Sequence, residues 1–224
     1  MKNLKRIIKL IITEPKFEIL FKYALGKKVK ILDVGCGNHS AQRTKEFLPI
    51  CKYFGIDKTK HYYNSPKDFQ IMDKFWLIDL ENSELKEIPN NFFDIIILSH
   101  TLEHLVNGLE VLMRLIKKLK VNGIIYIEFP STHTCLLPSL KRYNITFNFF
   151  DDYSHKKIIS KQKILNNLLK HNFIIKSAKI YFNWKRIIFL PFSMAYQFKI
   201  TRFKCLQQLW YLVGWCTYIL AIKN

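Results

Sequence analysis

Two glycines and one downstream acid form the most chemically suggestive spacing in this 224-residue chain. Gly35 and Gly37 follow the apolar run at residues 30–34, and a backbone without side chains can turn tightly there and approach a ligand closely. Asp57 ends the next apolar run, 22 positions after Gly35. An acid about 20 positions beyond a glycine turn is typical of sites that bind ribose hydroxyls. The spacing therefore predicts a nucleotide-like ligand at the end of a strand.

Such a site needs parallel strands that end at one edge of a sheet. Apolar runs of strand length lie at residues 30–34, 52–57, 75–80, 92–99 and 123–130. Helical segments are predicted between and after them, at 40–47, 102–119 and 161–170. Leucines recur at helical intervals through 102–119, and Asn122-Gly123 is expected to end the helix before the fifth strand begins. This alternation predicts a mainly parallel sheet with helices on both faces.

Four motifs in this order resemble those of class I S-adenosylmethionine-dependent methyltransferases. They are ILDVGCGN at 31–38, GIDKT at 55–59, LIDLEN at 77–82 and FFDIIILSHTLEHL at 92–105. The resemblance extends over residues 28–182. Asn38-His39-Ser40 stands where a dinucleotide fingerprint has its third glycine, which favours this family over nicotinamide enzymes.

The resemblance implies a fold and a domain organisation. The expected fold is α/β, a doubly wound, mainly parallel seven-stranded sheet of the Rossmann-like methyltransferase type. Its sixth strand would lie at 173–182, and its last strand, at 215–223, would be antiparallel. We expect an N-terminal helical extension at 1–27 and a methyltransferase domain at 28–224. An apolar and basic insertion at 185–213 would separate the last two strands.

The resemblance also implies S-adenosylmethionine as the cofactor and assigns its contacts. Backbone at Gly35, Cys36 and Gly37 would pass close to the methionine and ribose parts. Asp33 would orient the amino group or fix the loop. The full expected set is Asp33, Gly35, Cys36, Gly37, Asp57, Lys58, Asp79, Leu80 and Ser99.

The remaining contacts fall on later strands. Asp57 would bind the ribose hydroxyls and Lys58 would flank the adenine. Asp79 would accept from the adenine amino group, with Leu80 donating a backbone N–H, and Ser99 would face the cleft. An ordinary strand-end turn is the alternative interpretation of both aspartates.

Methyl transfer to oxygen requires an aligned acceptor and a base that removes its proton. Histidine is the commonest base because its pKa lies near neutrality. His100 directly follows the fourth strand, and His104 lies four residues later on the same helical face. Glu103-His104 matches a pair that is largely structural or cofactor-lining in this superfamily, and that interpretation is the stronger one.

The segment FFDDYSH at 149–155 resembles an Asp-Asp-x-x-His element of small methyltransferases found with bacterial surface-polysaccharide enzymes. Its acids and histidine could form a base with an orienting carboxylate, a divalent-metal site or a charged surface loop. We predict His155 and Asp152 as catalytic residues together with His100, and we expect no metal. His133 is a lower-ranked acceptor contact.

The charge is high and uneven. The net charge is +19, and residues 153–224 hold 13 Lys and Arg without a single acid. Lysine-rich composition bias explains this as well as an anionic partner does, whether membrane surface, phosphorylated substrate or nucleic acid. Five scattered cysteines without a C-x-x-C pair favour a reducing compartment over disulfides or zinc.

Two segments bear on membranes. The first 25 residues interleave basic and apolar side chains without a signal-peptide pattern. The apolar run 209–222 is shorter than the roughly 20 residues of a spanning helix. The insertion 185–213 mixes aromatic and basic residues, so we favour an interfacial helix on anionic lipid over a lid. We expect a cytoplasmic protein, peripheral on the inner membrane face.

These patterns favour O-methylation of a sugar or sugar-linked precursor of a cell-surface glycan, with a small-molecule or glycan acceptor. RNA methylation competes with it, but Ser99-His100-Thr101-Leu102 stands where base methyltransferases have Asn-Pro-Pro-Tyr, and nucleic acid is not an expected partner. Methylation of a lipid or quinone acceptor, and a non-catalytic role at a membrane, complete the range of functions that the sequence allows.

Overall fold

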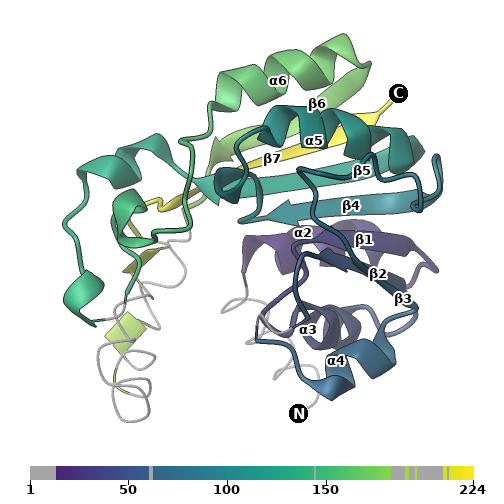
Figure 1. Cartoon of the computed structure of the whole chain (residues 1–224), viewed down its shortest axis with the longest axis horizontal. Helices are drawn as coiled ribbons and strands as arrows, with labels where there is room; N and C mark the ends of the chain where they lie inside the picture. The colour runs from purple at the N-terminus through teal and green to yellow at the C-terminus, as the bar shows by residue number, and fades with distance from the viewer. Residues whose placement is uncertain are drawn as a thin grey trace.

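Seven strands form one sheet in the order β3-β2-β1-β4-β5-β7-β6 (Figure 1). The computed structural model describes residues 14–60, 63–143, 145–182, 190–191, 195, 209–210 and 212–224. The strands are β1 Lys30–Val34, β2 Lys52–Asp57, β3 Lys74–Leu77, β4 Phe93–Ser99, β5 Leu119–Pro130, β6 Phe173–Ile180 and β7 Cys216–Lys223. Strands β1 to β5 pair in parallel, and β7 runs antiparallel between β5 and β6. This confirms the predicted doubly wound sheet with an antiparallel last strand.

Helices cover both faces of the sheet because its central strands are apolar on both sides. The α-helices are α2 Pro15–Ala24, α3 Ser40–Phe47, α4 Pro66–Ile71, α5 Gly108–Leu115 and α6 Lys161–Lys170. Short 3₁₀ helices are η1 Leu102–His104, η2 Ile116–Lys118, η3 Thr132–Leu136, η4 Lys141–Tyr143 and η5 Phe149–Asp151. In β4, Ile95 and Ile97 join the core with α2 and α3, while Ile96 and Leu98 join the core with α5 and α6. This period of two divides one strand between two cores.

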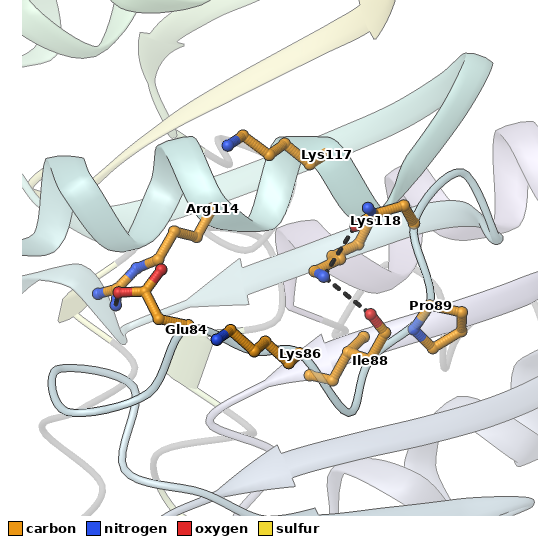
Figure 2. A pocket seen from close by; sticks show the side chains of 8 residues that line it. Glu84, Lys86, Ile88, Pro89, Arg114, Lys117 and Lys118 are labelled. Carbon is orange, nitrogen blue, oxygen red and sulfur yellow. Dashed lines mark hydrogen bonds and ion pairs between the residues drawn. The ribbon is translucent and has the colours of Figure 1, made fainter.

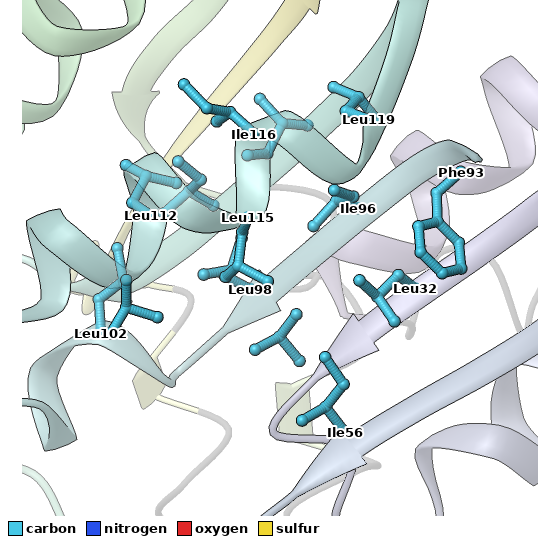
Figure 3. Packing of buried hydrophobic residues seen from close by; sticks show 14 of the residues in the cluster. Leu32, Ile56, Phe93, Ile96, Leu98, Leu102, Leu112, Leu115, Ile116 and Leu119 are labelled. Atoms are coloured by element: carbon cyan, nitrogen blue, oxygen red, sulfur yellow. The ribbon is translucent and has the colours of Figure 1, made fainter. Parts of the chain in front are cut away.

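The α5 core is the larger of the two. Figure 3 shows Leu112 and Leu115 of α5 lying over Ile96 and Leu98 of β4. All four side chains are inaccessible to solvent. Burying each of them contributes about 1.5–3 kcal/mol, so this packing holds the loop after β4 against a rigid support.

The predicted helix at 102–119 is confirmed only in part: η1, α5 and η2 lie within this range, but the chain breaks between η1 and α5. The Glu81 carboxylate accepts the backbone N–H of Val106 at 2.6 Å and of Asn107 at 3.0 Å. Those bonds replace the helical partners of these two groups, so a new helix starts at Gly108. The acceptor lies 25 residues upstream of Val106, so the local pattern does not reveal it.

Two strand boundaries also differ from the prediction. Strand β5 begins at Leu119, which pairs with Phe93, and it runs through Asn122-Gly123 instead of starting after them. Strand β3 ends at Leu77, where its pairing with Asp57 ends.

At the N-terminus, α2 belongs to the predicted extension at 1–27, and its Phe17, Leu20 and Ala24 are buried in the α3 core. The predicted interfacial helix at 185–213 falls almost entirely outside the described residues. Among the helices that the structure does describe, none combines the length and apolar character needed to cross a membrane. The four described cysteines, at positions 36, 51, 135 and 216, are free thiols.

Candidate functional site

The loop after β1 that contains Gly35 and Gly37, called the glycine loop below, lies where the strand order reverses. Strands β1 and β4 are neighbours, but the chain leaves β1 toward β2 and leaves β4 toward β5. Open α/β sheets bind ligands at the carboxyl ends of two such strands. Gly35 has φ +75°, and a Cβ at this position would lie 2.7 Å from Thr101 Oγ1. Its N–H donates to the Ile56 carbonyl at 2.8 Å. Only glycine therefore fits between the ends of β1, β2 and β4.

Asp33, on β1, holds the glycine loop in place through buried hydrogen bonds. Its Oδ2 accepts from Ser40 Oγ at 2.5 Å and from the Tyr53 hydroxyl at 2.6 Å, and the side chain is buried. Lys16 Nζ donates in turn to Ser40 Oγ at 3.0 Å. Of the two roles predicted for Asp33, these bonds serve the second, because they tie the start of α3 to β1 and β2.

Asp57 and Lys58 end β2 beside the loop. The Asp57 carboxylate is half-buried, and Oδ1 accepts the Thr59 N–H at 3.0 Å. Burial raises the pKa of Asp57, while backbone hydrogen bonds and the exposed Lys58 oppose the rise. An ionised carboxylate has about four lone-pair sites, so further donors such as two ribose hydroxyls fit here.

Asp79 and Leu80 lie on the next turn along the same edge. The N–H of Ile78 donates to the Asp57 carbonyl at 2.9 Å, which brings this turn beside the end of β2. The exposed Asp79 carboxylate accepts from the Glu81 N–H at 3.0 Å and from the Asn82 side chain at 2.8 Å. Asp79 thus shapes its own turn, and Leu80 is buried behind it.

A charged network follows β4. His100 Nδ1 lies 3.0 Å from Glu103 Oε1, and its Nε2 lies 3.6 Å from Glu128 Oε1. Burial alone would lower the pKa of His100, but the two carboxylates outweigh it and raise the pKa to about 10. Burial would raise the pKa of Glu128, but His100 brings it down to about 2. Ser99 Oγ donates to Glu128 Oε2 at 3.1 Å, which ties the end of β4 into the same network.

This network argues against the predicted role of His100 as a base. The raised pKa favours the imidazolium form, which has no lone pair to accept a proton. Glu128 is a member of this network that the sequence pattern did not predict. Its signal is an acid in the otherwise apolar run at 123–130, close to the end of a buried strand.

The segment at 149–155, which contains the predicted catalytic residues Asp152 and His155, lies beside η1 at the carboxyl end of β4. Lys156 N–H and Lys157 N–H both donate to the Glu103 carbonyl, at 2.8 and 3.2 Å, and so tie the segment to η1. The rings of His155 and His104 are 4.9 Å apart, and His155 stacks on Phe149 at 4.5 Å.

The two aspartates of this segment have different surroundings. Asp151 Oδ2 accepts the N–H groups of Phe147 and Asn148 at 2.9 and 2.8 Å, so Asp151 stabilises the loop. Asp152 Oδ2 lies 3.9 Å from His155 Nε2, and Oδ1 accepts from Ser154 Oγ at 2.6 Å. Asp152 is therefore the aspartate that faces the histidine pair.

The hydrogen bonds fix the tautomer of both histidines. The Phe149 carbonyl can only accept, so His155 Nδ1, 2.7 Å away, carries the hydrogen. Ser154 Oγ gives its hydrogen to Asp152, so it accepts from His104 Nδ1 at 2.9 Å. Burial lowers the pKa of His104, which favours its neutral form. In the neutral form, each imidazole has its lone pair on Nε2. His133, the lower-ranked contact, instead lies 2.7 Å from the Val213 carbonyl through Nε2.

A separate hollow of about 360 Å³ lies beside α5 (Figure 2). Its basic lining is Lys86, Arg114, Lys117 and Lys118, and Lys118 Nζ donates to the Ile88 carbonyl at 2.8 Å. None of the predicted site residues lines this hollow. Arg114 and Lys118 donate to backbone carbonyls around it, and the glycine loop with the neighbouring strand ends remains the candidate site.

Comparisons with known proteins bear on the family and the fold. A family model described as "Methyltransferase domain" matches residues 25–179. No match to a curated protein sequence was found. A SAM-dependent methyltransferase from Archaeoglobus fulgidus superposes with a TM-score of 0.62 at 18% identity, covering 93% of this chain and 91% of that one.

Two further structures share the fold. The plantazolicin methyltransferase BpumL in complex with SAH gives a TM-score of 0.60 at 20% identity, covering 98% of this chain and 84% of its own. A SAM-dependent methyltransferase from Aquifex aeolicus gives 0.57 at 14% identity, covering 100% and 98%.

Proposed function

This chain belongs to the class I S-adenosylmethionine-dependent methyltransferase family, and from this premise we propose that it methylates a hydroxyl of a sugar or sugar-linked acceptor. The family assignment gives the enzyme class and the cofactor. The choice of acceptor depends on the residues that would face it.

The residues at the glycine loop fit the cofactor. Gly35 exposes its backbone at the carboxyl end of β1. A side chain at this position would clash with Thr101. Asp57 offers a half-buried carboxylate for the ribose hydroxyls, and the turn at Asp79 and Leu80 lies next to it for the adenine. S-adenosylmethionine supplies a methyl group activated by a sulfonium. The protein contributes the position of that group relative to the acceptor.

One observation carries the acceptor assignment: the segment at 149–155 is tied to η1, directly after β4. This places His155 and Asp152 at the strand edge that also carries the glycine loop. The Nε2 lone pairs of His104 and His155 are the proton acceptors there, and Asp152 stabilises the charge that either ring gains. An acceptor hydroxyl that donates to one Nε2 would lose its proton as its oxygen takes the methyl group.

Aromatic side chains support a sugar as the acceptor. Trp210 and Trp215 stack at 4.4 Å with their planes 11° apart, and Trp215 lies 5.3 Å from His100. Trp215 is buried, whereas Trp210 is only partly buried. The accessible part of the Trp210 ring is an apolar aromatic surface of the kind that packs on the apolar face of a sugar.

The basic C-terminal third supports an acceptor attached to a polyanion. Residues 153–224 carry 13 Lys and Arg and no acid, which favours a nucleotide-linked or lipid-linked diphosphate sugar over a neutral free sugar. A lipid carrier would bring the enzyme to the cytoplasmic face of a membrane, in keeping with the proposed peripheral location.

The test is methyl transfer from labelled S-adenosylmethionine to a panel of acceptors. The panel contains nucleotide sugars, lipid-linked sugars, structured RNA, a quinone precursor and plantazolicin precursor peptide. We expect label in a sugar-containing acceptor, and none with Asp57→Ala. Transfer to RNA, quinone or peptide with none to any sugar would overturn the proposed acceptor and leave the enzyme class intact.

A further inference from the structure

Glu103, His104 and His155 meet in one cluster at the end of β4. One ligand atom from each lies within 4.8 Å of the other two. Glu103 is inaccessible to solvent and the side chain of His155 is only 4% exposed. These side chains come from η1 and from a segment about 50 residues later, joined by the two backbone bonds to the Glu103 carbonyl. The cluster is thus built by the tertiary fold.

Glu103 has an unused ligand atom. Its Oε1 lies 3.0 Å from His100 Nδ1, but the buried Oε2 has no hydrogen-bond partner among the residues that the structure describes. Buried carboxylate oxygens are almost always hydrogen-bonded or bound to a cation. A cation bound between this carboxylate and the two histidines would satisfy this oxygen.

Both histidines are oriented as metal ligands usually are. Each gives its Nδ1 hydrogen to an oxygen, His155 to the Phe149 carbonyl and His104 to Ser154 Oγ. Such bonds hold the ring and leave Nε2 as the ligand atom, as is usual for the outer hydrogen bonds of metal-bound histidine. Ser154 is itself held by Asp152, so the support extends to a further carboxylate.

The local charge favours a dication. The carboxyl groups of Glu103 and Asp152 both lie beside the histidine pair. Two carboxylates match the charge of one divalent ion. Lys156, the nearest lysine in the sequence, pairs instead with Glu81 at 3.1 Å.

We propose that Glu103, His104 and His155 bind one divalent transition-metal ion of the zinc class. Two imidazoles and one carboxylate form a three-ligand set that leaves a coordination position open, whereas Mg²⁺ and Ca²⁺ prefer oxygen ligands alone. A tetrahedral ion with bonds of about 2.0–2.2 Å needs ligand atoms about 3.3 Å apart. Side-chain rotations that close the present spacing by up to about 1.5 Å are therefore sufficient.

The open position is the place for an acceptor hydroxyl. A bound dication would occupy both Nε2 lone pairs and replace them in activating the acceptor, because it would lower the pKa of that hydroxyl. The proton could then leave to solvent or to Asp152 while the oxygen bonds to the methyl group and the S–CH₃ bond breaks to leave S-adenosylhomocysteine. This role rests on the proposed function. The binding of the ion does not, because it can be measured without any acceptor.

The test is equilibrium binding of Zn²⁺ and Co²⁺ to untagged, metal-stripped protein, followed by calorimetry and by the Co²⁺ absorption spectrum. We expect one equivalent bound, with a tetrahedral or five-coordinate spectrum that lacks thiolate charge-transfer bands. His104→Asn and His155→Asn keep a donor in place of Nδ1–H and remove Nε2, so each should weaken binding by at least about tenfold. Ser154→Ala keeps all three ligands but removes the oxygen that holds His104 and bonds to Asp152, and it should weaken binding by about tenfold.

The matched control is His171→Asn, which changes an exposed histidine at the end of α6. It should bind metal like the wild type, and all four variants should bind S-adenosylhomocysteine like the wild type. The proposal is overturned if the stripped protein binds neither ion, if the spectrum shows thiolate ligands, or if the two Nε2-removing variants bind as tightly as His171→Asn. Lack of methyl transfer to every acceptor, with metal binding intact, would overturn the proposed acceptor alone.

Discussion

Replacing Gly35 by alanine should damage both the fold and the cofactor site, and the structure separates the two causes. At φ +75° an alanine is strained, and its Cβ would lie 2.7 Å from Thr101 Oγ1. That hydroxyl donates to the Val34 carbonyl at 2.7 Å, so moving it breaks a buried hydrogen bond. The perturbation therefore acts on β1, on the start of η1 and on the loop between them.

The expected magnitude follows from these contacts. A left-handed conformation costs a non-glycine residue about 1–2 kcal/mol, partly offset by the stiffer unfolded chain. Loss of the Thr101 hydrogen bond adds about 0.5–1.5 kcal/mol. Gly35→Ala should lower the free energy of unfolding by about 2–3 kcal/mol. It should weaken S-adenosylhomocysteine binding by at least about tenfold, because the backbone beside the ligand must shift.

Gly26→Ala is the matched control. Gly26 has nearly the same φ, +73°, but no atom lies within 4 Å of the position of its Cβ. This variant should lose about 1 kcal/mol and keep the wild-type affinity. Urea unfolding and calorimetry measure both quantities. Equal losses of stability in the two variants, with unchanged affinity in Gly35→Ala, would refute the argument that Thr101 confines this loop.

Three further predictions concern charge and packing. Glu128→Gln should destabilise the protein by about 2 kcal/mol near pH 6, a moderate value because the His100 side chain is 35% exposed. In the wild type, the His100–Glu128 pair should stabilise the protein most between about pH 4.5 and 6.5. The pKa of His100 is raised, so its contribution to stability is lost as pH rises toward about 10; the pKa of Glu128 is lowered, so its contribution is lost as pH falls toward about 2. A stability difference between wild type and variant that does not change with pH would contradict this. Asp33→Asn should cost about 2 kcal/mol in urea unfolding, because a buried charged acceptor of two hydroxyls is lost, and a cost near zero would rule out its role in fixing the loop. Ile96→Ala should cost about 3 kcal/mol and Leu136→Ala, at 88% exposure, less than about 0.5, so similar thermal shifts in both would contradict the assigned core.

The strands that carry the candidate cofactor site were predictable because the sequence patterns that specify them are local. The run at 52–57 and the helices at 40–47 and 161–170 coincide with β2, α3 and α6, since periodicity and flanking residues specify them. The antiparallel last strand was predicted from the family resemblance, and its pairing with β5 and β6 confirms it.

Several features of the site depend on contacts between distant residues. The break after η1 depends on Glu81, and the charge of His100 depends on Glu128, 28 residues later. The cluster of Glu103 with His155 needs a loop that returns over η1. No local pattern reports such contacts, so the sequence predicted His155 as a candidate without its neighbour Glu103, and it predicted His100 as a base without the Glu128 carboxylate that faces it.

The most direct test of the central claim is calorimetric binding of S-adenosylhomocysteine to the wild type, Asp57→Asn and Asp94→Asn. Asp57→Asn keeps an acceptor for the Thr59 N–H but removes the charge that would bind the ribose. Asp94 lies at the start of β4, where it pairs with Lys120 at 2.6 Å, and so makes the same substitution at the opposite edge of the sheet. A cofactor site at the carboxyl edge predicts affinity lowered about tenfold to a hundredfold in Asp57→Asn alone, since hydrogen bonds to a charged group contribute about 1.5–3 kcal/mol. Wild-type affinity in Asp57→Asn, or equal loss in both variants, would contradict it.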